Sequence, residues 1–254
     1  MKFVAPTPAS PPQRVYLADG CWLTYHVAGE GQPIVLVHGL AGSTRWWGRN
    51  VGPLAQHCCV YTVDLIGFGH SRSGRRFVLD EAAAVLAEWM DRLDLPCATF
   101  VGHSMGGLIV THLALQYPAR VERLVLVDAA TFPIALRPLA RLPSLILALR
   151  HLPLSLLPTI IPDTLRAGLR TLWTALAALR RHTLERELAK VQAPTLVVWG
   201  ERDTVLPLDN GLRLAEALPD ARLVILPRVG HNAMWEGAAQ FNRAVLDFLG
   251  LTQD

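Results

Sequence analysis

Short apolar runs alternate with longer amphipathic stretches along most of the chain. Residues 22–27 alternate between apolar and polar side chains and predict an early antiparallel strand. Other runs are continuously apolar, which is typical of strands buried on both faces of a sheet. These runs are residues 34–37, 60–63, 98–101, 124–127, 195–199 and 223–226.

Helical patterns separate these runs. The expected helices cover residues 46–57, 79–93, 105–117, 209–218 and 238–249. Strand–helix alternation of this kind predicts an α/β fold with a mostly parallel sheet that helices cover on both faces. Right-handed crossovers place the carboxyl ends of the parallel strands at one edge, where sites form in open α/β sheets.

One stretch interrupts this alternation. Residues 132–190 are rich in leucine, alanine and arginine, and the prolines between Pro133 and Pro162 predict a set of short helices. We interpret the stretch as a helical cap inserted between two parts of one core, residues 1–131 and 191–254. No window holds about 18 uninterrupted apolar residues, so no transmembrane segment is expected.

The segment Gly102-His103-Ser104-Met105-Gly106 follows an apolar strand and opens an apolar helix. This context is the one required of a nucleophile elbow, in which serine occupies a sharp strand-to-helix turn. Side chains at positions 102 and 106 would clash with the neighbouring backbone there. We therefore predict that Ser104 is a catalytic nucleophile.

A serine hydroxyl needs a base and a group that orients the base. His231 follows the run at 223–226, and Asp203 follows the run at 195–199, so both are expected at the same sheet edge as Ser104. The order Ser, Asp, His along the chain favours a Ser104–His231–Asp203 triad. Asp128, which ends the run at 124–127, is the alternative acid.

Attack on a carbonyl also requires donors for the resulting oxyanion. The backbone N–H groups of Met105 and Leu40 are the candidates, the latter from the loop after residues 34–37. His38 in that loop is expected to be structural. Asp64 and Ser71 are expected to anchor the next glycine-rich loop. The residues expected to contact substrate are Gly39, His103, Leu145, Leu149, Trp173 and Val205.

Composition narrows the functional class. Hydrophobic residues make up 51% and charged residues 18% of the 254 residues, so a large core can form. The net charge of +3 does not favour nucleic-acid binding.

The four cysteines, Cys21, Cys58, Cys59 and Cys97, show no metal-ligand spacing and suit a reducing compartment. No metal or cofactor is expected. Because the N-terminal residues 1–13 lack the apolar run of a signal peptide, we expect a cytoplasmic protein.

Together, His38-Gly39, the 64–71 loop, the 102–107 elbow and the Asp203 and His231 loops resemble the α/β-hydrolase superfamily, within it the small capped esterases, lipases and carbon–carbon bond hydrolases. The resemblance implies a mostly parallel eight-stranded sheet, a cap inserted after the sixth strand, and an acyl-enzyme on Ser104. Serine at position 104 disfavours dehalogenases and epoxide hydrolases of this superfamily, which carry aspartate there.

The substrate is expected to be a small ester. Ser104 and Asp203 are 203 − 104 = 99 positions apart, which leaves room for only a short apolar cap and favours a carboxylesterase for short- to medium-chain or aromatic esters. A carbon–carbon bond hydrolase, a lactonase or thioesterase, and a cofactor-free perhydrolase are the alternatives with the same triad. A non-catalytic binding protein of this fold is the alternative from another class.

The amphipathic cap is suited to contact with a lipid interface. The chain is expected to act as a monomer or homodimer.

Overall fold

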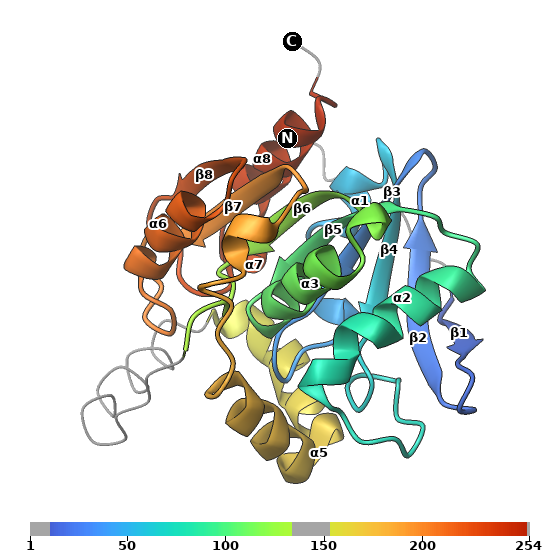
Figure 1. The fold of residues 1–254 in the computed structure, drawn as a ribbon. Coiled ribbons are helices and arrows are strands. Elements are labelled where there is room, and N and C mark those ends of the chain that lie inside the picture. Colours follow the sequence, from blue (N-terminus) through green and yellow to red (C-terminus); the bar gives the residue numbers. More distant parts are fainter. Residues whose placement is uncertain (1–10, 134–152, 253–254) are drawn as a thin grey trace.

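The computed structural model describes residues 11–133 and 153–252, and its centre is one eight-stranded sheet (Figure 1). The strand order is β1-β2-β4-β3-β5-β6-β7-β8. β1 and β2 pair antiparallel with their neighbours, and all pairs from β4 to β8 are parallel. The strands are β1 (Gln13–Tyr16), β2 (Trp22–Ala28), β3 (Gln32–Val37), β4 (Cys58–Asp64), β5 (Ala98–His103), β6 (Val121–Val127), β7 (Thr195–Gly200) and β8 (Ala221–Leu226).

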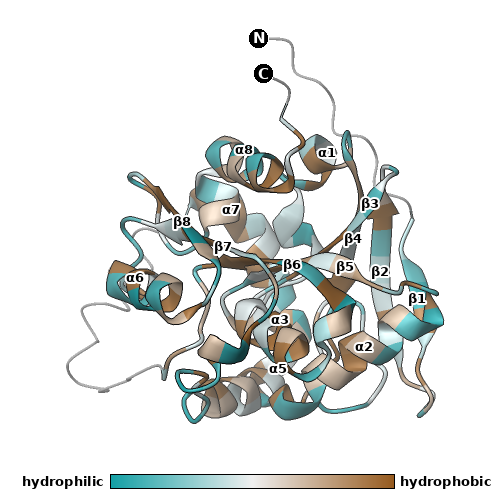
Figure 2. Ribbon diagram, turned by 45° about the horizontal axis from the view of Figure 1, so that its top comes forward, coloured by the Kyte–Doolittle hydropathy of each residue, from teal (hydrophilic) through white to brown (hydrophobic). Residues whose placement is uncertain are grey.

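Helices cover both faces of this sheet, as Figure 2 shows. One face packs against α2 (Ala82–Arg92), α3 (Met105–Gln116) and α6 (Leu208–Ala217), and the other against α1 (Val51–Leu54), α7 (Ala233–Glu236) and α8 (Ala238–Leu249). The continuously apolar strands serve both cores: in β3, Val35 and Val37 face the first, whereas Ile34 and Leu36 face the second. The eight-stranded α/β architecture predicted from the sequence is confirmed.

Two local predictions are wrong. The helix expected over residues 46–57 is replaced by a short 3-10 helix, η1 (Thr44–Trp47), and the single turn α1. Between them Asn50 donates its side-chain N–H groups to Met234 O and Asn242 Oδ1, so tertiary contacts fix an irregular path. The sequence also gave no sign of β1, which has only four residues and is held by its pairing with β2.

The segment between β6 and β7 differs from the expected short helices. After η4 (Leu154–Leu156), α5 runs over Leu157–Leu179 with one interruption at Gly168. Pro162 lies inside α5 and cannot donate to the carbonyl of Pro158. The guanidinium of Arg45 donates to that carbonyl instead, at 3.1 Å, so the proline is accommodated without ending the helix.

Short 3-10 helices complete the described chain: η2 (Leu79–Glu81), η3 (Pro118–Arg120) and η5 (Leu188–Lys190). Within residues 11–133 and 153–252, no helix is both long and apolar enough to cross a bilayer.

Candidate active site

Ser104 lies in the turn between β5 and α3. Its φ of 51° and ψ of −114° are strained for a residue with a side chain. A Cβ atom at Gly106 would lie 2.3 Å from Val37 O, and one at Gly102 would lie 2.5 Å from Gly106 O. The turn therefore needs glycine at both positions. Backbone bonds hold the strained serine, with its N–H donating to Val127 O at 2.9 Å.

A chain of hydrogen bonds joins Ser104, His231 and Asp203. His231 Nδ1 is 2.7 Å from Asp203 Oδ2, and His231 Nε2 is 3.1 Å from Ser104 Oγ. The carboxylate can only accept, so Nδ1 carries the proton and the bare Nε2 accepts from the serine hydroxyl. The three side chains thus have the relative order that proton transfer from a serine nucleophile requires.

Asp203 is held in place by backbone donors from its own loop. Its Oδ1 accepts from Val205 N at 2.7 Å and Leu206 N at 2.8 Å, which leaves Oδ2 for His231. Val205, expected to contact substrate, is therefore a neighbour of the acid, and its side chain is partly exposed.

Asp128, the alternative acid, has a different set of partners. Its carboxyl oxygens accept from Gly200 N at 2.8 Å and Ala233 N at 3.3 Å, and so connect the end of β7 to the start of α7. Complete burial raises the pKa of Asp128 well above its ordinary value, and the nearby charge of Asp203 adds to the effect. Of the two acids, the structure places Asp203 against His231.

The loop that carries His231 is held from two sides. Glu236 accepts from Gly230 N at 2.9 Å and from Asn232 N at 3.2 Å. His103 Nε2 donates to the backbone carbonyl of His231 at 2.9 Å, and the two rings lie 5.0 Å apart. Sequence reasoning missed Glu236, whose only signal is an acid five positions after the histidine.

The loop after β3 packs against the nucleophile. A Cβ atom at Gly39 would lie 3.1 Å from Ser104 Cβ and 2.8 Å from His103 Nδ1, so Gly39 packs against the nucleophile turn, and its contact with substrate stays a prediction. Leu40 follows Gly39 in this loop, and Met105 opens α3 directly after Ser104. Their role as oxyanion donors stays a prediction.

His38 maintains the shape of that loop. Its Nδ1 donates to Gly39 O at 2.8 Å, and its Nε2 accepts from Leu65 N at 3.1 Å. Burial lowers the pKa of His38, more than the charge of Asp64 raises it, so the ring is neutral.

The 64–71 loop is anchored as the sequence suggested. Asp64 accepts from Thr44 N at 2.7 Å and His70 N at 2.8 Å, and Ser71 Oγ donates to Asp64 O at 2.7 Å. Burial opposes ionisation of Asp64, but the hydrogen bonds from His70 and from the Thr44 amide outweigh it, and the pKa of Asp64 is lowered.

The expected substrate contacts from the cap fare differently. Leu145 and Leu149 lie outside the described residues. Trp173 is exposed on α5, whereas Ala167 and Ala175 of the same helix are buried, and its contact with substrate stays a prediction. His103 is buried beside His231, where its ring supports the loop.

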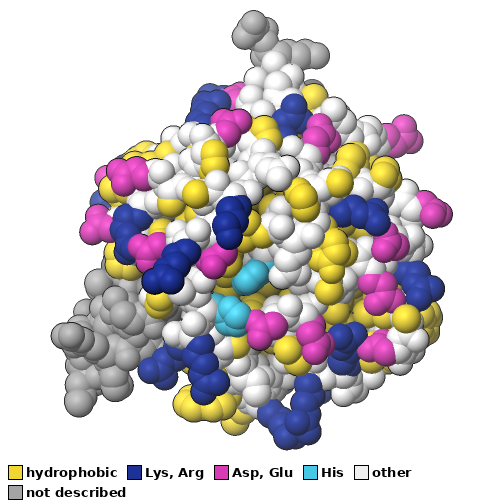
Figure 3. Space-filling model, in the orientation of Figure 1, with side chains coloured by type: hydrophobic (Ala, Val, Ile, Leu, Met, Phe, Trp, Pro, Cys, Tyr) yellow, Lys and Arg dark blue, Asp and Glu magenta, His cyan; other side chains and the backbone are white. Residues whose placement is uncertain are grey.

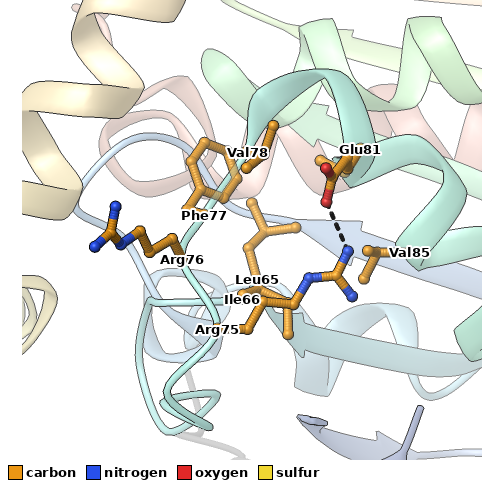
Figure 4. Close-up of a pocket in the computed structure, with 9 residues that line it drawn as sticks. Leu65, Ile66, Arg75, Arg76, Phe77, Val78, Glu81 and Val85 are labelled. Atoms are coloured by element: carbon orange, nitrogen blue, oxygen red, sulfur yellow. Dashed lines mark hydrogen bonds and ion pairs between the residues drawn. The ribbon is translucent and has the colours of Figure 1, made fainter. Parts of the chain in front are cut away.

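The cavity in Figure 4 lies away from the triad. It is lined by residues of the 65–66 and 75–85 segments, among them Phe77 and Val85, and Arg75 closes it by pairing with Glu81 at 2.7 Å. A larger groove of about 370 Å³ separates η2 from α5, with Arg76, Arg170 and Thr171 on its walls. Neither cavity is lined by Ser104, Asp203 or His231.

Among the described residues, His103, Asp128 and His231 form one group whose donor atoms lie within 4.8 Å of one another, as metal ligands can. The hydrogen bonds given above already engage His103 Nε2, both Asp128 oxygens and both His231 nitrogens. We therefore interpret the group as part of the bonded framework of the site and assign no ion to it.

Comparison with known proteins identifies the family. The model for the alpha/beta hydrolase fold matches residues 32–190, and a model described as TAP-like protein matches residues 173–252. The first match covers more than half of the chain, and the chain therefore belongs to the alpha/beta hydrolase family.

Its relatives include hydrolases named for oxo-dienoate substrates. The chain is 32% identical to the 2-hydroxy-6-oxo-6-phenylhexa-2,4-dienoate hydrolase of Burkholderia cepacia, over 87% of this chain and 89% of that protein. It is 35% identical to the 2-hydroxy-6-oxononadienedioate/2-hydroxy-6-oxononatrienedioate hydrolase of Burkholderia vietnamiensis, over 91% and 92%. The enol-lactonase of Burkholderia xenovorans is a structural neighbour with a TM-score of 0.82 and 25% identity, which covers 94% of this chain and 100% of that one. These relatives support a hydrolase, but not specifically the expected carboxylesterase.

Proposed function

We propose that this protein is a serine hydrolase that cleaves the bond between an acyl carbon and a stabilised carbon leaving group, with Ser104 as nucleophile. The observation that carries the proposal is the pair of hydrogen bonds from Ser104 Oγ to His231 Nε2, at 3.1 Å, and from His231 Nδ1 to Asp203 Oδ2, at 2.7 Å. A hydroxyl in this arrangement loses its proton to the imidazole as it attacks a carbonyl.

Each group then has a defined task. Ser104 Oγ adds to the carbonyl carbon while its proton passes to His231 Nε2, and Asp203 stabilises the imidazolium that forms. The backbone N–H groups of Leu40 and Met105 bind the oxyanion. The carbon–carbon bond breaks, its electron pair leaves with the conjugated fragment, and that fragment takes up a proton. Water then hydrolyses the acyl-serine to a carboxylic acid and restores the hydroxyl.

The relatives support the carbon–carbon bond as the target. Two hydrolases named for 6-oxo-dienoate substrates match the chain at 32% and 35% identity over nearly their whole length. In substrates so named, the carbon that leaves, C5, belongs to a double bond, so we propose that a proton first moves from the 2-hydroxyl oxygen to C5. The resulting 2-oxo group is conjugated through C3 and C4 with C5 and stabilises the carbanion that is released from C6.

A second candidate is hydrolysis of an ester or lactone by the same triad. It is favoured by the structural similarity to an enol-lactonase, with a TM-score of 0.82. The acyl-enzyme step is the same in both reactions, and only the leaving atom differs, so the fold alone does not decide between them.

A direct competition between substrates tests the proposal. We expect purified enzyme to cleave 2-hydroxy-6-oxo-6-phenylhexa-2,4-dienoate, followed by loss of its visible absorbance, with a higher kcat/KM than p-nitrophenyl esters or an enol-lactone. Ser104→Ala should lower kcat by about 10³-fold or more on every substrate, because the residual site offers only binding and oxyanion stabilisation.

Ser155→Ala is the matched control, because within the described part of the chain the Ser155 hydroxyl accepts hydrogen bonds from Arg49 and Trp235 and from no residue of the site. It should retain wild-type rates and Ser104-dependent labelling by a fluorophosphonate probe. Cleavage of esters but not of the dienoate would transfer the assignment to the second candidate. Labelling that survives Ser104→Ala, or is absent from the wild type, would refute the nucleophile.

A further inference from the structure

The helix α5 presents its large apolar side chains to solvent. Ile161, Leu165, Leu169 and Trp173 recur every four residues and are 53%, 75%, 87% and 70% exposed. Leu154, just before the helix, is 81% exposed. Gly168 interrupts α5 between Leu165 and Leu169, so these side chains lie on two successive parts of the helix. Large apolar side chains exposed along both parts indicate a contact with another apolar phase or molecule. We call these five residues the outer stripe.

The opposite side of α5 explains why the helix keeps this orientation. Its buried residues are Thr159, Asp163, Ala167, Ala175 and Leu179, of which only the last has a large apolar side chain. Asp163 is fully buried and accepts from Ser43 Oγ at 2.6 Å and from Arg45 Nη1 at 3.3 Å. Rolling the helix to hide the outer stripe would break these bonds and expose the Asp163 carboxylate, so the stripe stays outward.

The charged side chains of the segment that contains α5 are mostly positive. Residues 154–182 contain four arginines, Arg166, Arg170, Arg180 and Arg181, and one acid, Asp163. The acid is withdrawn from the surface by its burial, whereas Arg170, Arg180 and Arg181 are exposed. Figure 3 shows Arg and Lys side chains beside hydrophobic ones along the lower edge, over α5. The outer side of α5 is therefore apolar and cationic.

We propose that the outer stripe and its arginines dock the protein on an anionic lipid surface. A helix with leucine and tryptophan on one side and arginines beside them is suited to lie in the plane of a membrane interface, and the arginines attract acidic headgroups. A second copy fits less well, because a two-fold interface on this stripe would bring the same arginines face to face. Docking here would hold α5 against the membrane.

Vesicle flotation tests the docking without any use of activity. Wild-type protein should float with phosphatidylcholine vesicles that contain about 30% phosphatidylglycerol, and much less with phosphatidylcholine alone. Leu165→Ser combined with Leu169→Ser should weaken binding at least about tenfold. Arg170→Gln combined with Arg180→Gln should weaken it about 25-fold on anionic vesicles only, and salt should have the same effect.

The matched control is Leu212→Ser combined with Ile225→Ser, which removes two exposed apolar side chains from α6 and β8 and should leave flotation unchanged. Circular dichroism and fluorophosphonate labelling at Ser104 verify the fold of each variant. If the double leucine variant does not fold, the double arginine variant decides the outcome. Absence of flotation overturns the proposal. So does a wild-type dimer in sedimentation that the leucine pair converts to a monomer, because the stripe would then join two copies.

Discussion

Two aspartates of this protein have different roles because their hydrogen-bond partners differ. Asp203 and Asp128 both follow parallel strands at the same sheet edge, and both are buried. Asp203 keeps one oxygen for the imidazole of His231, whereas both oxygens of Asp128 accept backbone N–H groups. The sequence predicted the pair of candidates, and only the directions of the side chains distinguished them.

Replacement of each aspartate should therefore have a different effect. Asp203→Asn should lower kcat by about 10⁴-fold with little change in KM, because an amide facing Nδ1 favours the wrong imidazole tautomer. Asp128→Asn should instead lower the free energy of unfolding. A carboxamide has only one accepting oxygen, so one of the two backbone N–H groups that Asp128 binds would lose its acceptor. Steady-state kinetics and urea denaturation of the two variants measure this. A loss of kcat in Asp128→Asn as large as in Asp203→Asn would reverse the assignment.

At the scale of elements, the regular helices and strands of the core were predictable. α8 coincides with the expected residues 238–249, and the central apolar runs all became strands. α5 was not predictable from its prolines, because Arg45, more than one hundred residues earlier, supplies the donor that Pro162 lacks. Propensity describes only the isolated segment, whereas this bond depends on the fold.

The interruption of α5 depends on one residue. Gly168 has φ 74° and ψ 152°, a conformation that is close to exclusive to glycine, and a Cβ atom there would meet nothing within 4 Å. Gly168→Ala should lower the free energy of unfolding by about 1–3 kcal/mol through backbone strain alone. Urea denaturation followed by circular dichroism measures it. A gain of about 1 kcal/mol, as for glycine replaced in a regular helix, would show that residue 168 is helical in solution.

The whole molecule buries neutral histidines among its two cores. Burial lowers the pKa of His38, and it lowers that of His103 well below the ordinary value, with the neighbouring His231 adding to the effect. The unfolded chain therefore binds protons on these residues at a higher pH than the folded protein does. His70 has the opposite shift, because Asp64 raises its pKa, and its contribution is lost only as the pH rises above the ordinary histidine range.

We accordingly expect stability to fall as the pH drops below about 6.5. In that range the unfolded state gains protons that the folded state excludes, and the free energy of unfolding should decrease by about 1.4 kcal/mol per pH unit for each of the two histidines. Urea denaturation at a series of pH values gives the slope. His103→Gln keeps a donor for His231 O and should reduce the slope by about 1.4 kcal/mol per pH unit, whereas an unchanged slope would place the effect on other groups.

The sequence alone determined the fold class, the elbow around Ser104 and the set of residues from which the triad is drawn. These features are local, since a tight turn needs its glycines and a doubly buried strand needs a continuous apolar run. Tertiary structure decided what depends on contacts between distant segments: the acid that faces His231, the support from Glu236 and His103, and the burial of Asp163 against Ser43. The contact of Asp163 with Ser43 fixes which side of α5 faces solvent. The sequence shows that a helix has an apolar side, but whether that side faces the core or the solvent depends on such contacts.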